Sequence, residues 1–184
     1  MKRLTRWSLA LGALLALCGV APGAAMADGP KTEVIRLQDA CDLDSFNANP
    51  LTAGGCVRDA GGVSAEEFLA KINPKDFGHR AWWFNTSGGR VGTTTIRAGD
   101  TLRAVNEGGE IHSFTEVAQF GPGCVPEINQ AAGLSGPPAA DCALMMNAFV
   151  APGAEETTVS GLQDGVHRFE CLIHPWMQTT ITVR

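Results

Sequence analysis

Basic residues are scarce along most of this chain. Three of the 14 Lys and Arg residues lie within the first six positions, which leaves eleven to oppose 19 Asp and Glu residues, a formal charge of −8 beyond that start. A nucleic-acid-binding protein needs enough cations to neutralise a row of phosphates. The balance therefore excludes nucleic acid as a partner and favours a basic or mixed-charge one.

Long apolar segments are also missing. The apolar run at residues 7–20 is too short to span a bilayer, and nothing later in the chain is long enough either. That run follows a basic start and leads to the small residues 25–27, a pattern typical of a secretory signal peptide over residues 1–27. A lipid-modified Cys18 is the alternative, although Leu17 before it is bulky for such a site. We expect an exported, periplasmic protein with one domain and no membrane span.

Cysteines are odd in number once the signal peptide is set aside. Cys41 and Cys56 lie close together in a polar, Gly-rich stretch, and Cys124 and Cys142 bracket a stretch rich in Gly, Pro and Ala. Exported proteins tend to pair their thiols. Four cysteines allow three pairings, and neighbourhood favours Cys41 with Cys56 and Cys124 with Cys142. Cys171 is then the free thiol.

Short strands separated by turn residues fill the chain from about residue 81 onward. They are expected at residues 81–85, 91–97, 101–106, 111–117, 155–161, 166–171 and 179–183. Many short strands with Gly and Pro between them indicate an all-β fold, an antiparallel β-sandwich.

Two segments depart from that pattern. Residues 28–78 read as an N-terminal extension with one strand at 33–37, a disulfide loop, and one short helix that starts at the capping box Ser64–Glu67. The domain proper is then expected at residues 79–184. Within it, residues 119–148 form a long insertion rich in Gly, Pro and Ala.

The segment from Cys171 to Met177 carries the strongest chemical signal. It reads C-L-I-H-P-W-M, so the thiol of Cys171, the imidazole of His174 and the thioether of Met177 lie within seven residues. Sulfur and imidazole ligands suit copper, whereas a Met thioether is a poor ligand for zinc. A tight loop at a strand end can turn all three toward one point, so the sequence predicts a copper site.

A trigonal copper site with one thiolate needs a second imidazole. The chain has four histidines in total, so the remaining candidates are His79, His112 and His167. His112 follows the turn at residues 108–109 and begins a predicted strand, a natural place for a ligand from an adjacent strand, and we choose it. His167 reads as a packed histidine and His79 as a loop residue.

On these residues the chain resembles the cupredoxins, and within them the amicyanin- and plastocyanin-like proteins. TTTIRAGDTLRAVNEGGEIHSFTEV resembles the family's two strands, Gly-Asp turn and ligand His, and C-x-x-H-P-x-M matches the amicyanin ligand loop. The resemblance covers roughly residues 81–184. It implies a Greek-key sandwich and one type 1 ("blue") copper ion, with His112, Cys171 and His174 in a plane and Met177 as a long axial ligand.

The resemblance also implies how the site meets solvent. His174 would lie at an exposed edge with Pro175 and Trp176 beside it, and an exposed Trp176 would form an apolar docking patch; burial against the loop is the alternative. Ser113 departs from the family, in which Asn often follows the first ligand His and ties the two ligand loops together. Its hydroxyl can still hydrogen-bond there.

The expected function is single-electron transfer through Cu(I)/Cu(II) cycling, with a redox protein such as a cytochrome, dehydrogenase or reductase as partner. Copper sequestration or delivery is the alternative, although the chain has only the pair Met145-Met146 and no Met-rich cluster. A copper enzyme is not expected, because four histidines cannot ligate further copper ions and a closed ligand set leaves no open position for substrate.

Overall fold

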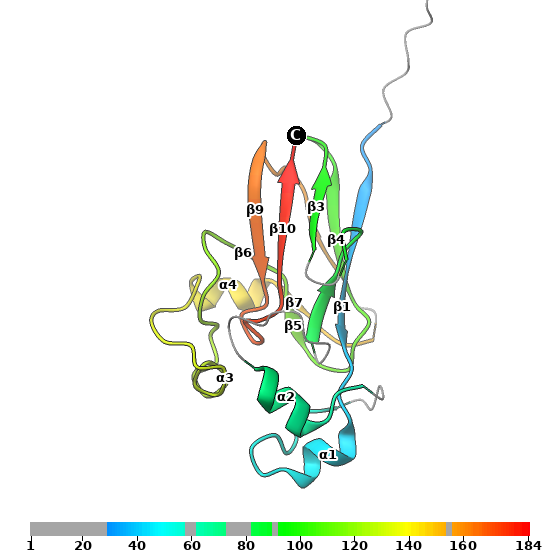
Figure 1. Cartoon of the computed structure of the whole chain (residues 1–184). Coiled ribbons are helices and arrows are strands. Elements are labelled where there is room, and N and C mark those ends of the chain that lie inside the picture. Colours follow the sequence, from blue (N-terminus) through cyan, green and yellow to red (C-terminus); the bar gives the residue numbers. More distant parts are fainter. Residues whose placement is uncertain (1–28, 58–61, 73–81, 90–91, 154–155) are drawn as a thin grey trace, which may run out of the picture.

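The computed structural model describes residues 29–57, 62–72, 82–89, 92–153 and 156–184. The signal peptide expected over residues 1–27 and the loop histidine His79 lie outside these ranges. Strands form the body of the described chain, and short helices gather at one end and along one side of it (Figure 1).

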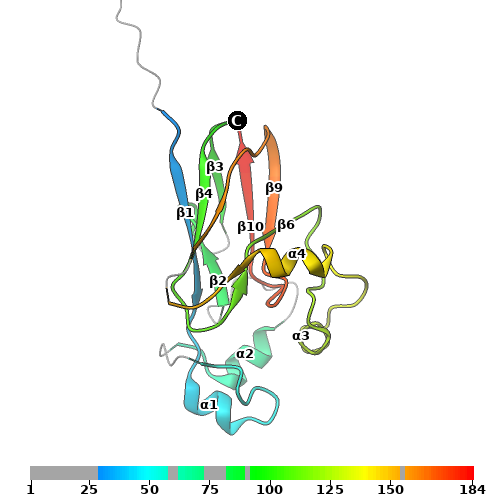
Figure 2. The same cartoon turned by 180° about the vertical axis from the view of Figure 1, so that it is seen from behind.

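Two four-stranded sheets make up that body (Figure 1, and from behind in Figure 2). The first sheet has the strand order β2-β1-β4-β8 and the second β3-β10-β9-β6. Their bounds are β1 Thr32–Asp39, β2 Trp82–Asn85, β3 Thr93–Ile96, β4 Thr101–Asn106, β6 Thr115–Val117, β8 Glu156–Val159, β9 Gly165–Glu170 and β10 Gln178–Val183. The all-β sandwich predicted from the sequence is confirmed.

Both sheets are mixed rather than purely antiparallel. β1 pairs with β4 in parallel, and so does β3 with β10, whereas the other neighbours in the two sheets are antiparallel. A parallel pair needs a long crossover between its strands, and several elements lie between the members of each pair here. The expected antiparallel arrangement is therefore wrong for these two pairs. The sequence could not reveal this, because side chains alternate between the two faces of a strand in the same way whether its neighbour is parallel or antiparallel.

Strand β1 belongs to the sandwich, although the sequence assigned it to an extension. Its parallel register runs from Thr32 opposite Thr101 to Leu37 opposite Asn106, and Leu37 is fully buried. A boundary at residue 78 therefore cuts through the first sheet. The resemblance began only near residue 81, so nothing in the sequence tied β1 to the strands that follow.

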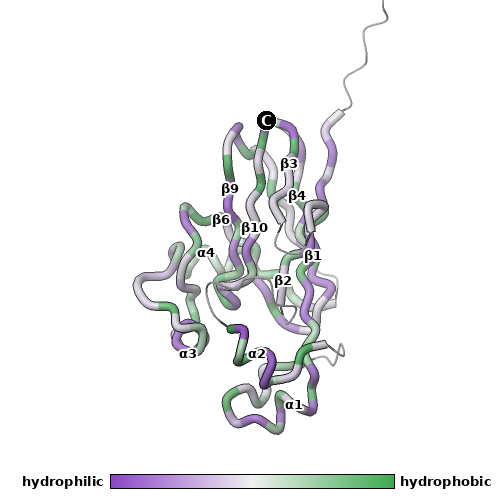
Figure 3. The backbone as a smooth tube through the Cα atoms, in the orientation of Figure 1, coloured by the Kyte–Doolittle hydropathy of each residue, from purple (hydrophilic) through white to green (hydrophobic). Residues whose placement is uncertain are grey.

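Aromatic rings fill the middle of the sandwich. Phe114 stacks on Phe169 with ring centroids 4.4 Å apart, and Phe84 meets Phe114 edge-on at 5.5 Å. All three rings are almost completely buried, and each such burial stabilises a fold by about 1.5–3 kcal/mol. Apolar residues are distributed along the strands in Figure 3 rather than collected at one end.

Four short helices flank the sandwich in the described part of the chain. They are α1 Leu43–Ala48, α2 Ala65–Lys71, α3 Pro126–Ala131 and α4 Cys142–Asn147. The expected helix start at Ser64 is confirmed at α2, where the Ser64 hydroxyl accepts from the Glu67 N–H. Residues 28–78, as far as they are described, hold two helices rather than the one expected. The helix α1 was not predicted because, like α3 and α4, it has only six residues, too few to display a helical period. No described helix is long and apolar enough to cross a membrane.

Two disulfides hold the helical segments. Cys41–Cys56 closes a separation of 15 residues around α1, and Cys124–Cys142 closes one of 18 around α3. These are the pairs that neighbourhood favoured, and Cys171, which is buried, is the free cysteine among the described residues. On the chain-entropy account, a closed loop of about 15 residues stabilises the folded state by about 3 kcal/mol.

Candidate metal centre

The loop between β9 and β10 is closed by its own backbone. The Cys171 N–H donates to Met177 O over 3.0 Å, and the Met177 N–H donates to His174 O over 2.8 Å. The second bond closes a β-turn with Pro175 at its second position, which the fixed φ of proline suits. This loop therefore bends Cys171, His174 and Met177 together, and all three are at most 8% exposed.

His112 reaches the same place from another strand. The strand expected at residues 111–117 is interrupted at Phe114. Its first part, β5 (His112–Ser113), pairs with β7 (Phe149–Val150), whereas β6 continues along β9. The change of partner leaves His112 fully buried at the end of the sandwich.

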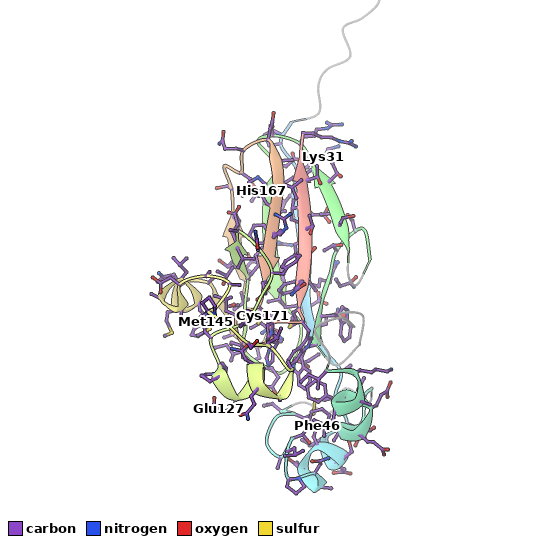
Figure 4. All side chains as sticks on the ribbon, turned by 60° about the vertical axis from the view of Figure 1, so that its left-hand side comes forward. Lys31, Phe46, Glu127, Met145, His167 and Cys171 are labelled. Atoms are coloured by element: carbon purple, nitrogen blue, oxygen red, sulfur yellow. A yellow bond between two sulfur atoms is a disulfide. The ribbon has the colours of Figure 1, made fainter. Side chains whose placement is uncertain are left out.

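Three buried side chains meet there. His112 Nδ1 lies 3.2 Å from His174 Nδ1, and Cys171 Sγ lies 3.8 Å from the same nitrogen. The three ligand atoms are all within 4.8 Å of one another, and no other such group of His, Cys, Asp or Glu occurs among the described residues. Figure 4 shows Cys171 at the end of the sandwich near the helices, with His167 well away from it.

The two histidines favour the thiolate of Cys171. Burial alone would raise the pKa of this thiol, but hydrogen bonding and charge attraction from His112 and His174 lower its pKa well below the usual value. The backbone N–H groups of Ser113 and His174 also donate to Sγ, over 3.3 and 3.4 Å. The thiolate is the form that ligates a metal.

This donor set fits copper. One thiol and two imidazole Nδ1 atoms converge where all three side chains are buried, and a buried thioether, Met177, closes the same loop. Two imidazoles, one thiolate and a Met are the set that suits copper, whereas structural zinc sites are built from four Cys or His ligands.

The Ser113 hydroxyl joins the two ligand-bearing segments. It accepts from the Leu172 N–H over 2.8 Å and from the Thr115 hydroxyl over 3.2 Å. The hydroxyl was expected to form a hydrogen bond at this position, and its bond to the Leu172 N–H links the strand that carries His112 to the Cys171 loop.

Buried polar side chains also shape the turn before His112. Asn106 donates to Glu110 O and Val150 O over 2.7 and 2.8 Å and accepts from the Gly108 N–H over 2.9 Å. Asp39, at the end of β1, lies 3.6 Å from His112 Nε2. Burial lowers the pKa of the His112 imidazole, but Asp39 and Cys171 raise it to about 9. Burial also acts on the Asp39 carboxyl, raising its pKa, yet His112 and two backbone N–H groups bring it below its usual value.

His174 is covered rather than exposed. It is 8% exposed, and the ring of Trp82 stacks on it at a centroid distance of 5.4 Å and an interplanar angle of 17°. Trp176 is 4% exposed and Pro175 is also buried, so the expected docking patch of Pro175 and Trp176 is not at the surface. Burial of Trp176, the alternative, is what the structure shows, because Phe68 of α2 packs against its ring at 5.6 Å.

One opening leads toward His174. A pocket of about 200 Å³ lies between the α1–α2 segment and α3 and reaches the imidazole, with Phe46, Phe68, Ile128 and Trp82 among its apolar walls. Among the described residues, this pocket gives the buried His174 imidazole one route of approach from solvent.

Sequence reasoning missed Asp39, Phe68 and Trp82 as neighbours of the site. Each contacts it only after distant segments fold together, and none has a spacing that points to His112 or His174. The one signal for Trp82 was its place in a predicted strand, which suggested packing but no particular partner.

Fold and site together define a β-sandwich protein with a buried His-Cys-His cluster suited to a metal ion. No family model and no curated protein matches the chain. Solved structures do match, and three are a purple cupredoxin from Nitrosopumilus maritimus, a mutant plastocyanin of a fern and an amicyanin variant in its Cu(I) form. Their identities are 15%, 19% and 16%; they cover 50% of this chain and 77%, 83% and 69% of their own, with TM-scores of 0.33, 0.32 and 0.29. At this level of similarity the comparisons carry no argument about function, which must be inferred from the side chains of the site.

Proposed function

We propose that this chain is a type 1 copper protein that carries single electrons and holds one copper ion through His112, Cys171, His174 and Met177. The observation that carries the proposal is the buried cluster of one thiol and two imidazoles, whose ligand atoms lie within 4.8 Å of one another. Copper bound by such a set serves as both Cu(I) and Cu(II), so it can accept or release an electron with little rearrangement.

The chain's own residues prepare the site for that role. The loop hydrogen bonds and Ser113 fix the ligands before any metal arrives, and burial excludes water. Two backbone N–H groups donate to the Cys171 sulfur, and such bonds help to set the potential of a copper–thiolate site. A preorganised, dry site favours electron transfer over ready release of the metal.

The proposal also covers where the protein acts and which kind of protein it exchanges electrons with. A signal peptide over residues 1–27 would deliver the chain to the periplasm, where both disulfides persist. The partner would be a redox protein such as a cytochrome, dehydrogenase or reductase. A closed ligand set has no position for a substrate, so we propose a carrier rather than an enzyme, and copper delivery is the competing function that the experiment must separate.

Titration of the purified apoprotein with Cu(II) tests the proposal. We expect one equivalent to bind and to produce an intense thiolate-to-copper visible band that disappears on reduction and returns on reoxidation. Cys171→Ser should lack the band, whereas Thr158→Ser, a small change on a strand away from the site, should keep it. A colourless complex that yields its copper quickly to a chelator would instead indicate delivery.

A further inference from the structure

The orientation of the His112 ring leaves its Nε2 atom in need of a hydrogen-bond acceptor. Nδ1 faces His174 Nδ1 at 3.2 Å, so on the proposed function, on which this inference rests, Nδ1 is the atom that binds copper. A neutral imidazole that ligates through Nδ1 carries its hydrogen on Nε2. That nitrogen is buried and has no hydrogen-bond partner among the described residues, and a buried donor needs an acceptor.

The carboxylate of Asp39 is held beside this nitrogen. Asp39 Oδ2 lies 3.6 Å from His112 Nε2, and the exposed fractions of the two side chains are 1% and 0%. The Gly109 N–H donates to both carboxylate oxygens, over 3.0 and 2.8 Å, and the Glu110 N–H donates to Oδ2 over 2.9 Å. The same turn that carries His112 therefore fixes the carboxylate.

The turn that passes the Asp39 carboxylate has no room for a side chain at Gly108. A Cβ atom added at Gly108 would collide with the Asp39 carboxylate, so a glycine is needed where the turn passes it. A buried carboxylate is costly unless it is paired and hydrogen-bonded. Two backbone donors on one side and an imidazole on the other meet that requirement.

We infer that Asp39 is the positioning residue of the copper ligand His112, accepting its Nε2–H and fixing the orientation and tautomer of the ring. A carboxylate on the outer N–H of a ligating histidine raises the basicity of the imidazole. A more basic ligand, next to an added negative charge, stabilises Cu(II) more than Cu(I). Asp39 thereby lowers the reduction potential, and β1 becomes part of the copper site.

Asp39→Asn tests this assignment, with Glu33→Gln on the same strand as the matched control. Asn keeps an acceptor for the turn but presents an N–H₂ group or a weaker acceptor to Nε2–H. We expect Cu(II) affinity to fall about 10–100-fold and Cu(I) affinity to fall less. Each tenfold fall in Cu(II) affinity relative to Cu(I) affinity raises the reduction potential by about 59 mV. Glu33→Gln, which removes the same charge farther from the site, should leave both quantities unchanged.

A second readout needs no copper. In the wild-type apoprotein, the Nε2-bound proton of His112 should resonate far downfield, as a carboxylate-bound imidazole proton does, and Asp39→Asn should move it upfield. If Asp39→Asn fails to fold, the wild-type resonance decides, and a position typical of a solvent-bonded imidazole overturns the inference. If the wild-type protein binds copper and Asp39→Asn has the same reduction potential as wild type, the inference is also overturned, while the proposed function stands. A wild-type protein that shows the downfield proton but binds no copper overturns the function and leaves the Asp39–His112 bond in place.

Discussion

One hydroxyl connects two parts of the chain that are far apart in sequence. Ser113 follows His112, and its Oγ accepts from the backbone N–H of Leu172, which is next to Cys171. Both residues are fully buried, so water cannot replace the bond if the hydroxyl is removed. The relative position of His112 and Cys171 therefore depends on a side chain that ligates nothing.

Ser113→Ala should destabilise the protein by about 1–3 kcal/mol, because it leaves the buried Leu172 N–H without its acceptor. The measurement is chemical unfolding of the apoprotein, followed by the position of the thiolate-to-copper band after loading. Thr115→Val is the matched control: it removes only the hydroxyl that donates to Ser113 and should cost less. Equal losses in the two variants would contradict the role given to the Leu172 bond.

The hydrogen bonds of His167, away from the proposed copper site, lead to a second prediction at the residue scale. Its Nδ1 lies 2.6 Å from Glu116 Oε1 and its Nε2 lies 2.7 Å from Gln163 O. Both partners accept, so both ring nitrogens must donate, which only the imidazolium can do. The bond to Glu116, and then that to Gln163 O, raises the pKa of His167.

A pKa raised in the folded state gives stability that is full below the unfolded value of about 6.5 and is lost as pH rises through the folded value. The free energy of unfolding of wild type minus that of His167→Gln should therefore be larger at pH 6 than at pH 9. Glu116 is 48% exposed, so screening should keep the change below about 1 kcal/mol. A difference that does not vary with pH would show that the pair contributes nothing through protonation.

Some of these residues were predictable and others were not. Cys171, His174 and Met177 lie within seven positions, so a single loop brings them together whatever the rest of the fold does. Cysteine parity then identified the free thiol independently. Asp39 and Trp82 meet the site only through the sheet, and their sequence neighbourhoods carry no trace of the contact.

The α1–α2 segment covers one side of the metal centre. Phe68, 7% exposed, packs on Phe46, Trp82 and Trp176 at centroid distances of 5.5, 4.9 and 5.6 Å, and Trp82 stacks in turn on His174. This chain of rings joins α2 to His174, a proposed copper ligand. The segment is therefore a cover for the site as well as part of the fold.

Phe68→Ala should open that cover. We expect a loss of about 3–5 kcal/mol in stability, the usual cost of removing a buried Phe ring, and faster transfer of bound copper to an external chelator. Stopped-flow mixing of the loaded protein with the chelator measures the second effect. Phe68→Leu, which keeps most of the apolar volume, should fall between wild type and Ala.

Lys71→Ala on the same helix is the control, since Lys71 pairs with Glu67 at the surface and should change neither stability by more than about 0.5 kcal/mol nor copper release. An unchanged release rate in Phe68→Ala, despite lowered stability, would mean that the helix packs against the site without limiting access to it.

The sequence patterns predicted the elements of the sandwich better than their arrangement. Short runs of strand-forming residues between turn residues identified most of the strands, and alternation was clear in the last two. The parallel pairings of β1 with β4 and β3 with β10 depend on which distant segments meet, and alternation does not encode this. The helices of the insertion were missed for a different reason, since each is under two turns long and is held partly by the Cys124–Cys142 bridge.

The pairing of β1 with β4 has a consequence for how the molecule comes together. Asp39 stands at the end of the first described strand, whereas Cys171, His174 and Met177 lie just before the last. Contacts between such distant segments form late and slowly, because a long loop must close first. The proposed metal pocket is therefore complete only when both ends of the described chain have joined the sandwich. A fragment without the last strands would lack Cys171 and Met177, and a fragment without β1 would lack the Asp39 carboxylate beside His112.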